Sequence, residues 1–168
     1  MHRPEMWGYV QFENEATPFV QDPDWAAKCT LMDVYCGVGL FSAFLAGRCK
    51  RLIGVESSPA ACRDFAFNLD EFDNVELYED RAERALPALK THGDVVLVDP
   101  PRAGVGREAL AEIVRMAPPR LIYVSCDPAT LARDARRLTE AGLRLAEVRA
   151  FDLFPQTYHI ESISIFES

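Results

Sequence analysis

Short apolar runs rich in β-branched residues alternate with helical patterns along most of the chain. Runs such as Val95-Val96-Leu97-Val98 are apolar at every position, which is typical of strands covered on both faces. The strands expected are residues 30–35, 51–56, 75–79, 94–99, 120–125, 143–151 and 162–167. The helices expected between them are residues 40–46, 59–71, 82–90, 107–116 and 129–141. This alternation predicts an α/β fold with right-handed crossovers and a doubly wound parallel sheet.

The two ends of the chain depart from that pattern. No helical pattern separates the last two strands, so they are expected to form an antiparallel hairpin. Residues 1–29 are rich in Pro, Trp, acidic and amide side chains and cannot form a core alone. We therefore expect an N-terminal arm, or the remnant of a preceding domain, at 1–29 and one domain at 30–168.

Composition narrows the class of protein. With 168 residues, 49% hydrophobic and 26% charged, the chain has the balance of an ordinary globular domain. It lacks an apolar run near the ~20 residues that span a bilayer, and its first residues lack the pattern of a signal peptide. These features predict a cytoplasmic protein with no membrane partner. The net charge of −8 argues against nucleic-acid binding by this domain alone.

The cysteines do not form a recognisable framework. There are five, an odd number, and none has CxxC spacing, which argues against a set of disulfides and against a zinc site. No metal is expected.

A glycine turn follows the first strand. In Asp33-Val34-Tyr35-Cys36-Gly37-Val38-Gly39-Leu40-Phe41-Ser42, glycines allow backbone N–H groups to approach a ligand closely. Ligands of open α/β sheets bind beyond the carboxyl ends of the strands, where this turn lies. Ser42 replaces the third glycine of the dinucleotide fingerprint, so a simple tight strand–helix connection is the alternative.

An acidic residue ends the second strand. Glu56 lies roughly 20 residues after the glycines, where a carboxylate can accept hydrogen bonds from a ribose diol. A helix N-terminal acid before Ser57 is the alternative. Tyr35 is suited either to packing on the ligand or to the core, and Asp80 either to reaching an adenine or to capping a helix. Together these residues favour a cofactor that contains adenosine.

Two further strand ends carry reactive groups. Asp99-Pro100-Pro101 leaves the fourth strand with a stiff backbone, which directs Asp99 into the same crevice or forms a simple turn. Cys126 follows the fifth strand just before a helix, whose N–H groups can stabilise a thiolate. The other cysteines suit structural positions (Cys29, Cys49, Cys62) or the wall of the cofactor site (Cys36).

The segment before the last strand combines an acid and an imidazole with aromatic side chains. Glu161 or His159 is suited to general base catalysis there, and both are equally suited to structural roles.

These motifs occur in the order found in one family. Residues 33–42, 54–56, 99–104, 124–134 and 154–162 resemble successive motifs of the RNA 5-methyluridine methyltransferases, which are S-adenosylmethionine-dependent RNA uracil-C5 methyltransferases. The stretches Ser-Cys-Asp-Pro-Ala-Thr-Leu-Ala-Arg-Asp and Phe-Pro-Gln-Thr-Tyr-His-Ile-Glu-Ser are the specific ones. The resemblance runs from about Tyr9 to the end of the chain. It implies a Rossmann-like class I methyltransferase sheet, with the catalytic domain at 30–168.

The resemblance also implies roles. Cys126 would be the nucleophile and Glu161 the proton acceptor, because a thiolate added to C6 of uracil makes C5 nucleophilic and a base must then remove the C5 proton. The residues expected around S-adenosylmethionine, from the family pattern or from the turn and strand ends above, are Gln11, Tyr35, Gly37, Gly39, Leu40, Glu56, Asp80 and Asp99. The family's amino-edge asparagine is displaced by one position here, to Asn14.

The expected partner is an RNA substrate, either tRNA or rRNA, whose uridine is unstacked to reach the crevice. Family members carry RNA-binding structure before this domain, so additional structure is expected to bind the RNA. Five arginines suit either a phosphate-facing patch near Cys126 or a solvated face: Arg133, Arg136, Arg137, Arg144 and Arg149.

Two other functions remain open. An amino-methyltransferase is suggested by Asp99-Pro100-Pro101, although Arg102 stands where that chemistry usually has an aromatic residue, and Cys126 would have no function. A non-catalytic module that binds the cofactor is the other alternative.

Overall fold

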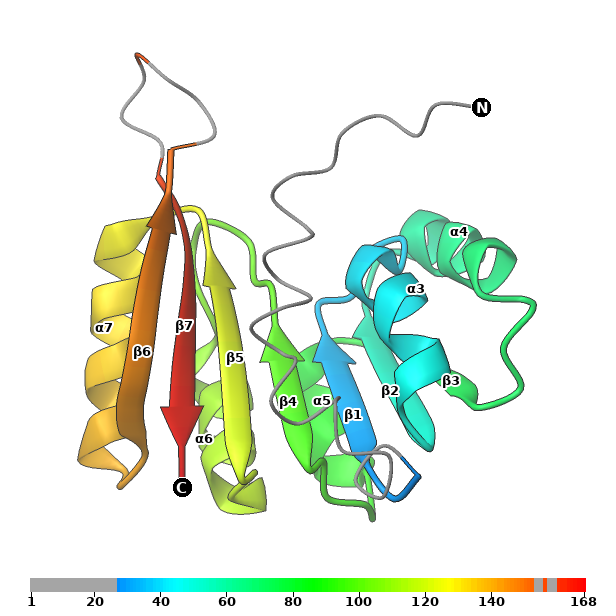
Figure 1. Cartoon of the computed structure of the whole chain (residues 1–168), viewed down its shortest axis with the longest axis horizontal. Helices are drawn as coiled ribbons and strands as arrows, with labels where there is room; N and C mark the ends of the chain where they lie inside the picture. The colour runs from blue at the N-terminus through cyan, green and yellow to red at the C-terminus, as the bar shows by residue number, and fades with distance from the viewer. Residues whose placement is uncertain (1–26, 153–155, 157–159) are drawn as a thin grey trace.

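The computed structural model describes residues 27–152, 156 and 160–168, and the sheet dominates this part of the chain. Its strands are β1 (Thr30–Val34), β2 (Arg51–Glu56), β3 (Val75–Glu79), β4 (Val95–Val98), β5 (Arg120–Ser125), β6 (Arg144–Phe151) and β7 (Glu161–Glu167). They form a seven-stranded sheet in the order β3-β2-β1-β4-β5-β7-β6 (Figure 1). The doubly wound α/β fold is therefore confirmed.

Strand direction follows the predicted pattern. The pairs among β1 to β5 are parallel, and β6 and β7 are antiparallel, which confirms the C-terminal hairpin. The sequence did not indicate where the hairpin would join the sheet. β7 inserts between β5 and β6 and runs antiparallel to β5.

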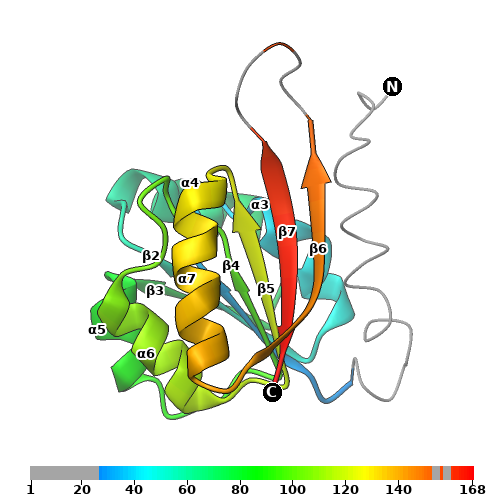
Figure 2. The same ribbon diagram turned by 90° about the vertical axis from the view of Figure 1, so that its left-hand side faces the viewer.

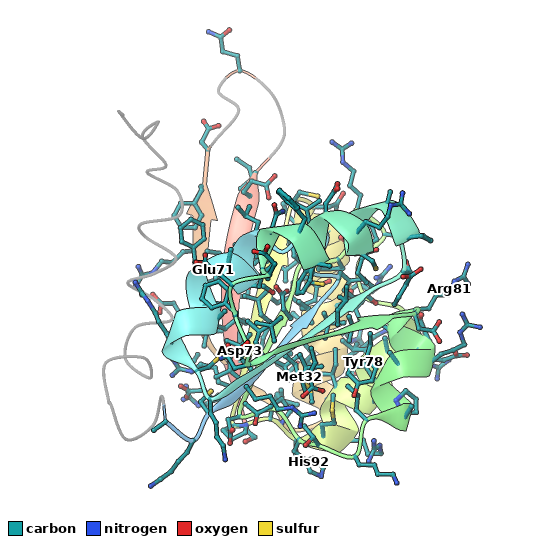
Figure 3. All side chains as sticks on the ribbon, turned by 90° about the vertical axis from the view of Figure 1, so that its right-hand side faces the viewer. Met32, Glu71, Asp73, Tyr78, Arg81 and His92 are labelled. Carbon is teal, nitrogen blue, oxygen red and sulfur yellow. The ribbon has the colours of Figure 1, made fainter. Side chains whose placement is uncertain are left out.

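Helices cover both faces of the sheet (Figure 2). They are α3 (Leu40–Leu45), η1 (Ala46–Arg48), α4 (Pro59–Asn68), α5 (Ala82–Ala88), α6 (Arg107–Met116) and α7 (Pro128–Glu140). One core cluster joins β1, β2, β4 and β5 to α5, α6 and α7, and it includes the fully buried Met32 (Figure 3). The other joins alternate residues of the same strands to α3 and α4, through Leu45 and Phe65. Strands apolar on both faces account for this three-layer arrangement.

Two predicted helices are shorter than expected. The helix predicted at 59–71 ends at Asn68, with Leu69 as its C-terminal cap, and the helix predicted at 82–90 ends at Ala88. Pro87 lies in the last turn of α5 and has no N–H to donate, which weakens this end of the helix.

The connectivity brings the strand ends of interest together. The chain moves outward from β1 to β2 and β3 and then returns to β4 on the other side of β1, which makes the β1–β4 boundary the topological switch point. Ligands of open α/β sheets bind at such a point, beyond the carboxyl ends. Because β7 is antiparallel, its first residue lies at this same edge. No helix in the described ranges is long and apolar enough to cross a bilayer.

Candidate active site

The two glycines of the turn after β1 have different functions. Both have positive φ, +55° at Gly37 and +86° at Gly39, a conformation that glycine adopts without steric cost. A Cβ at Gly39 would lie 2.4 Å from Leu69 Cδ1 and 2.8 Å from Phe65 Cδ2, so Gly39 allows α3 to pack closely on α4. A Cβ at Gly37 would meet nothing within 4 Å. Gly37 thus leaves open space at the switch point, whereas Gly39 is a packing residue.

Glu56 holds the glycine turn and the start of α4 together. Its Oε2 accepts a hydrogen bond from the Gly37 N–H at 3.1 Å. Its Oε1 accepts from the N–H groups of Ser57 and Ser58, both at 2.7 Å. A carboxylate has about four acceptor positions, so capacity remains for a ligand hydroxyl. Binding a ribose hydroxyl and stabilising the start of α4 are therefore compatible functions of the Glu56 side chain.

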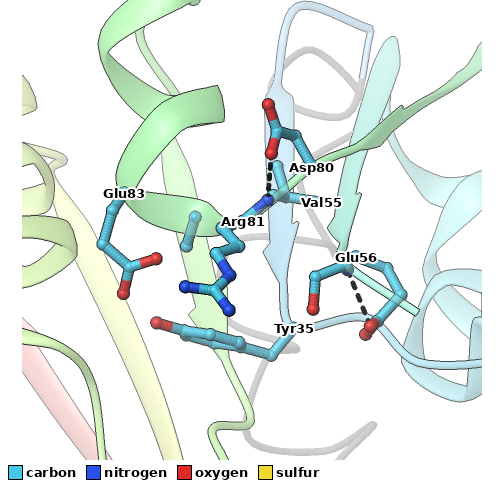
Figure 4. A pocket seen from close by; sticks show the side chains of 8 residues that line it. Tyr35, Val55, Glu56, Asp80, Arg81 and Glu83 are labelled. Carbon is cyan, nitrogen blue, oxygen red and sulfur yellow. Dashed lines mark hydrogen bonds between the residues drawn. The ribbon is translucent and has the colours of Figure 1, made fainter.

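A cavity of about 250 Å³ opens beside Glu56 (Figure 4). It is lined by Tyr35, Val55, Glu56, Ser57, Asp80, Arg81, Ala82 and Glu83. Three of the expected cofactor residues, Tyr35, Glu56 and Asp80, therefore share one cavity. Burial, with a further contribution from Glu83, raises the pKa of Tyr35 to about 12, so the phenol is neutral at physiological pH.

Arg81 and Glu83 are charged cavity residues that the sequence motifs did not indicate. The Arg81 side chain extends across the cavity toward Tyr35, and Glu83 approaches from the other side (Figure 4). Arg81 also lies at the outer rim of the molecule, past the end of β3 (Figure 3). Both residues follow Asp80 within three positions just after the end of β3, and this place in the sequence could have identified them.

Asp80 combines both functions weighed for it. It lines the cavity, and its Oδ1 accepts from the Arg81 N–H at 2.7 Å and pairs with Arg84 on α5. The hydrogen bond from the Arg81 N–H, together with Arg84, lowers the pKa of this carboxyl. Asp80 is thus an ionised acid that stabilises the start of α5 at the edge of the cavity.

Asp99 and Glu161 are electrostatic neighbours across β4, β5 and β7. Asp99 is an exposed residue, but surrounding protein atoms remove part of the hydration of its carboxyl group and raise its pKa to about 6. The negative charge of Glu161 adds to this shift. A like charge disfavours ionisation only when it is nearby, so the two carboxyl groups lie near one another at the carboxyl edge of the sheet.

The pairing of β5 with β7 brings Cys126 and Glu161 together. In the antiparallel ladder Ser125 pairs with Ser162, and the Ser162 hydroxyl donates to the Ser125 carbonyl at 3.3 Å. The ladder ends at this pair, and Cys126 follows Ser125 while Glu161 precedes Ser162, so both lie one residue beyond the last pair of the ladder. Cys126 is half-buried and directly precedes α7, whose N-cap Asp127 accepts from the Thr130 N–H at 2.8 Å.

A buried pair beneath the glycine turn was not anticipated. The Ser42 hydroxyl donates to Asp33 Oδ2 at 2.6 Å, and both residues are fully buried. Burial raises the pKa of Asp33 to about 7, against the lowering effect of this hydrogen bond. The sequence shows Ser42 only as a replacement for the third glycine of the fingerprint, whereas in the structure it is the partner of a buried acid.

The remaining expected residues do not line the cavity where the structure describes them. Gln11 and His159 fall outside the described residues. Leu40 begins α3 and is 39% exposed, and neither it nor Asp99 lines the cavity. Cys36 had been assigned to the cofactor wall, but its side chain is buried in the core beside Gly54, with Phe65 in the same cluster.

Each of the five candidate phosphate-binding arginines is paired with an acid. Arg133 and Arg137 pair with Asp134, Arg136 with Glu140, Arg144 with Glu167, and Arg149 with Glu147. These pairs reduce the positive charge that the five arginines present to an RNA backbone, although Arg133 and Arg137 share one acid.

The motifs and the geometry can now be compared with known proteins. The sequence profile of the tRNA (uracil-5-)-methyltransferase family matches residues 19–167. The chain belongs to this family. S-adenosylmethionine is the cofactor of this methyltransferase family, and the sheet is that of the class I methyltransferases, which confirms the expected resemblance and fold.

Relatives cover most of the chain. An uncharacterized RNA methyltransferase of Halalkalibacterium halodurans is 44% identical over 143 residues, which is 82% of this chain and 31% of that protein. One from Caldanaerobacter subterraneus is 42% identical over 145 residues, which is 83% of this chain and 32% of that protein. The chain thus spans about a third of the length of these relatives.

A solved structure supports the family fold. The Pyrococcus abyssi tRNA (uracil-54, C5)-methyltransferase in complex with S-adenosyl-L-homocysteine has a TM-score of 0.72 and 31% identity, covering 90% of this chain and 38% of that one. The N-methyltransferase NodS of Bradyrhizobium japonicum, at 18% identity and a TM-score of 0.69, shares the fold.

Proposed function

We propose that this domain methylates C5 of a uridine in tRNA or rRNA, with S-adenosylmethionine as the methyl donor. Membership of the uracil-5-methyltransferase family supports this reaction class. The observation that carries the proposal is the strand order, which places Asp99, Cys126 and Glu161 at the same edge of the sheet as Glu56 and its cavity.

The residues present fit the adenosyl part of the cofactor. Glu56 keeps an acceptor position for a ribose hydroxyl, Tyr35 offers an aromatic wall, and the open space above Gly37 leaves backbone accessible. Asp99, at the switch point, is suited to a cationic amino group when it is ionised. The cofactor, when bound, supplies an electrophilic methyl group.

Cys126 and Glu161 act on the uridine in this proposal. The Cys126 thiolate adds to C6, which pushes electron density onto C5. C5 then bonds to the methyl carbon as the bond from that carbon to the donor sulfur breaks, and S-adenosylhomocysteine is the leaving group. Glu161 then accepts the C5 proton, the C5–C6 double bond re-forms, and the C6–S bond breaks to release the thiolate. The ladder register that makes these two residues neighbours supports the assignment.

RNA binding is proposed to depend on structure beyond this domain. The net charge is −8, and the candidate arginines are paired with acids. Both features disfavour strong phosphate binding by the domain itself.

The test is incubation with methyl-labelled S-adenosylmethionine and either tRNA or rRNA, followed by nucleoside analysis. Label in 5-methyluridine is expected. Label on an exocyclic amino group would instead identify an amino-methyltransferase. Binding of S-adenosylhomocysteine without transfer to either RNA would identify a non-catalytic module.

A further inference from the structure

Asp134 on α7 is a fully buried acid that the proposed reaction does not use. Its Oδ2 accepts hydrogen bonds from the Val105 N–H and from the Tyr123 hydroxyl, both at 2.9 Å. Its Oδ1 accepts from Arg133 Nε at 2.9 Å and from Arg137 at 3.3 Å. One carboxylate thus joins three parts of the chain: α7, β5 and the loop 99–106 that follows β4.

The loop is held closely against α7. Arg133 donates from Nη2 to the Ala103 carbonyl at 2.8 Å, while Asp134 takes the Val105 N–H. Between them lies Gly104, with φ +78°, where a Cβ would lie 2.5 Å from both Asp134 Oδ2 and Arg133 Nη2. The backbone on both sides of Gly104 is therefore fixed by two adjacent side chains of α7.

The far end of the same loop reaches the cavity. The Gly106 backbone partly counters the rise in the pKa of the Tyr35 phenol. A Cβ at Gly106 would lie 2.4 Å from Glu83 Oε1. Tyr35 and Glu83 both line the cavity assigned to the adenosyl group. The loop 99–106 therefore contacts the cavity wall at one end and carries Asp99 at the other.

The other partners of Asp134 lead to the thiol. Tyr123 lies on β5, three residues before Cys126, and α7 begins two residues after Cys126. Both elements that flank Cys126 are thus bonded to the carboxylate that holds the loop.

We infer that Asp134 is a positioning residue that sets the separation between the cofactor cavity and Cys126. Methyl transfer needs the donor, the uridine ring and the thiol in one geometry, and misplacement by about 1 Å can cost about 100-fold in rate. A carboxylate bonded to both sides of the crevice limits such displacement. The inference rests on the proposed function for its catalytic consequence.

The test compares Asp134→Asn and Arg133→Gln with Arg136→Gln. Arg133 and Arg136 are exposed arginines on α7, each paired with an acid, but only Arg133 contacts the loop. The Asn variant keeps one uncharged oxygen that can accept from Val105 and Tyr123, and the half-exposed Arg133 and Arg137 can turn to solvent, so folding is expected. Circular dichroism at the assay temperature checks this.

For Asp134→Asn and Arg133→Gln, amide hydrogen exchange over residues 100–106 is expected to be about tenfold faster. Single-turnover methyl transfer at saturating RNA and cofactor is expected to be about 10- to 100-fold slower. The Kd of S-adenosylhomocysteine and the alkylation rate of Cys126 should stay within about threefold, because each half of the site is intact. Arg136→Gln should match wild type throughout.

Unchanged loop exchange in both variants would overturn the inference, as would faster exchange with unchanged methyl transfer. A loss of methyl transfer equal to the fraction of unfolded protein would show that Asp134 only stabilises the fold and would overturn the inference. Failure of wild type to make 5-methyluridine would refute the proposed function instead, and the exchange rates would still decide whether Asp134 holds the loop.

Discussion

Cys126 and Glu161 lie one position beyond the Ser125–Ser162 pair, at the same end of the antiparallel strands β5 and β7. Residues at adjacent ends of such a ladder are close neighbours even though 35 positions separate them in sequence. The charge of Glu161 also reaches Asp99 at the end of β4. One thiol and two carboxyl groups are thus brought to the same edge of the sheet by strand order.

Replacing Cys126 with Ala is expected to abolish methyl transfer, by at least about a thousandfold, since C5 of uracil is a poor nucleophile without a C6 adduct. S-adenosylhomocysteine binding should be unchanged, because the cavity does not include Cys126. Incorporation of labelled methyl into RNA and calorimetric titration measure the two effects. Cys49→Ala is the matched control, since Cys49 is also half-buried but lies before the start of β2, away from the site. Substantial turnover by Cys126→Ala would refute the covalent route.

Glu161→Gln is expected to trap a covalent complex with RNA, because the amide cannot accept the C5 proton after methylation and elimination stalls. A band that migrates more slowly than free protein on a denaturing gel and disappears after nuclease treatment would demonstrate it. Glu167→Gln, at the opposite end of β7, removes the same charge without touching the site and should give no such band. Normal product release by Glu161→Gln, with no adduct, would assign the base to another residue.

The local pattern of the chain predicted most of the architecture and the members of the site, but not how the members interact. Apolar runs and strand-end residues such as Glu56 and Asp99 are readable because their surroundings are set within a few positions. The insertion of β7 beside β5 depends on long-range pairing, and so did the neighbourhood of Cys126 and Glu161. In the sequence, a buried acid such as Asp33 cannot be distinguished from an exposed one, because only the packing of the folded chain shows that it has no access to water.

Glu56→Gln is expected to weaken S-adenosylhomocysteine binding about 10- to 100-fold. The substitution removes a charge that accepts hydrogen bonds from the N–H groups of Gly37, Ser57 and Ser58, and it turns an amide NH₂ toward one set of these donors. Calorimetric titration gives the Kd. Glu79→Gln is the matched control, because Glu79 pairs with Glu56 in the β2–β3 register but is exposed and does not line the cavity. Equal affinity for the two variants would remove Glu56 from the cofactor site.

Alanine substitutions at the two turn glycines should show which of them is required for packing. Gly39→Ala is expected to lower the free energy of unfolding by about 2–4 kcal/mol, since it adds a clash with Leu69 and Phe65 to the cost of positive φ. Gly37→Ala carries only the cost of positive φ, about 1 kcal/mol, because its Cβ meets open space. Urea unfolding measures both. Equal losses would show that the tight α3–α4 contact is not what requires Gly39.

The buried Asp33 should make stability depend on pH. Its folded pKa of about 7 lies above the value of about 3.9 in an unfolded chain. Between these values the folded state binds the extra proton, so the free energy of unfolding falls as pH rises through the window. Asp99, with a pKa of about 6, acts in the same direction. Asp33→Asn resembles the protonated acid and can still accept from Ser42, so its stability should decline less over that range.

Urea unfolding of wild type and Asp33→Asn at about pH 5 and about pH 8 tests this, with the variant gaining at least about 1 kcal/mol relative to wild type at the higher pH. Glu79→Gln, which removes an exposed charge, serves as the control and should parallel wild type. Parallel curves for wild type and Asp33→Asn would mean that Asp33 keeps an ordinary pKa in the folded protein. In that case the acid beneath the glycine turn would already be ionised at about pH 5, where a pKa of about 7 keeps the Asp33 carboxyl neutral.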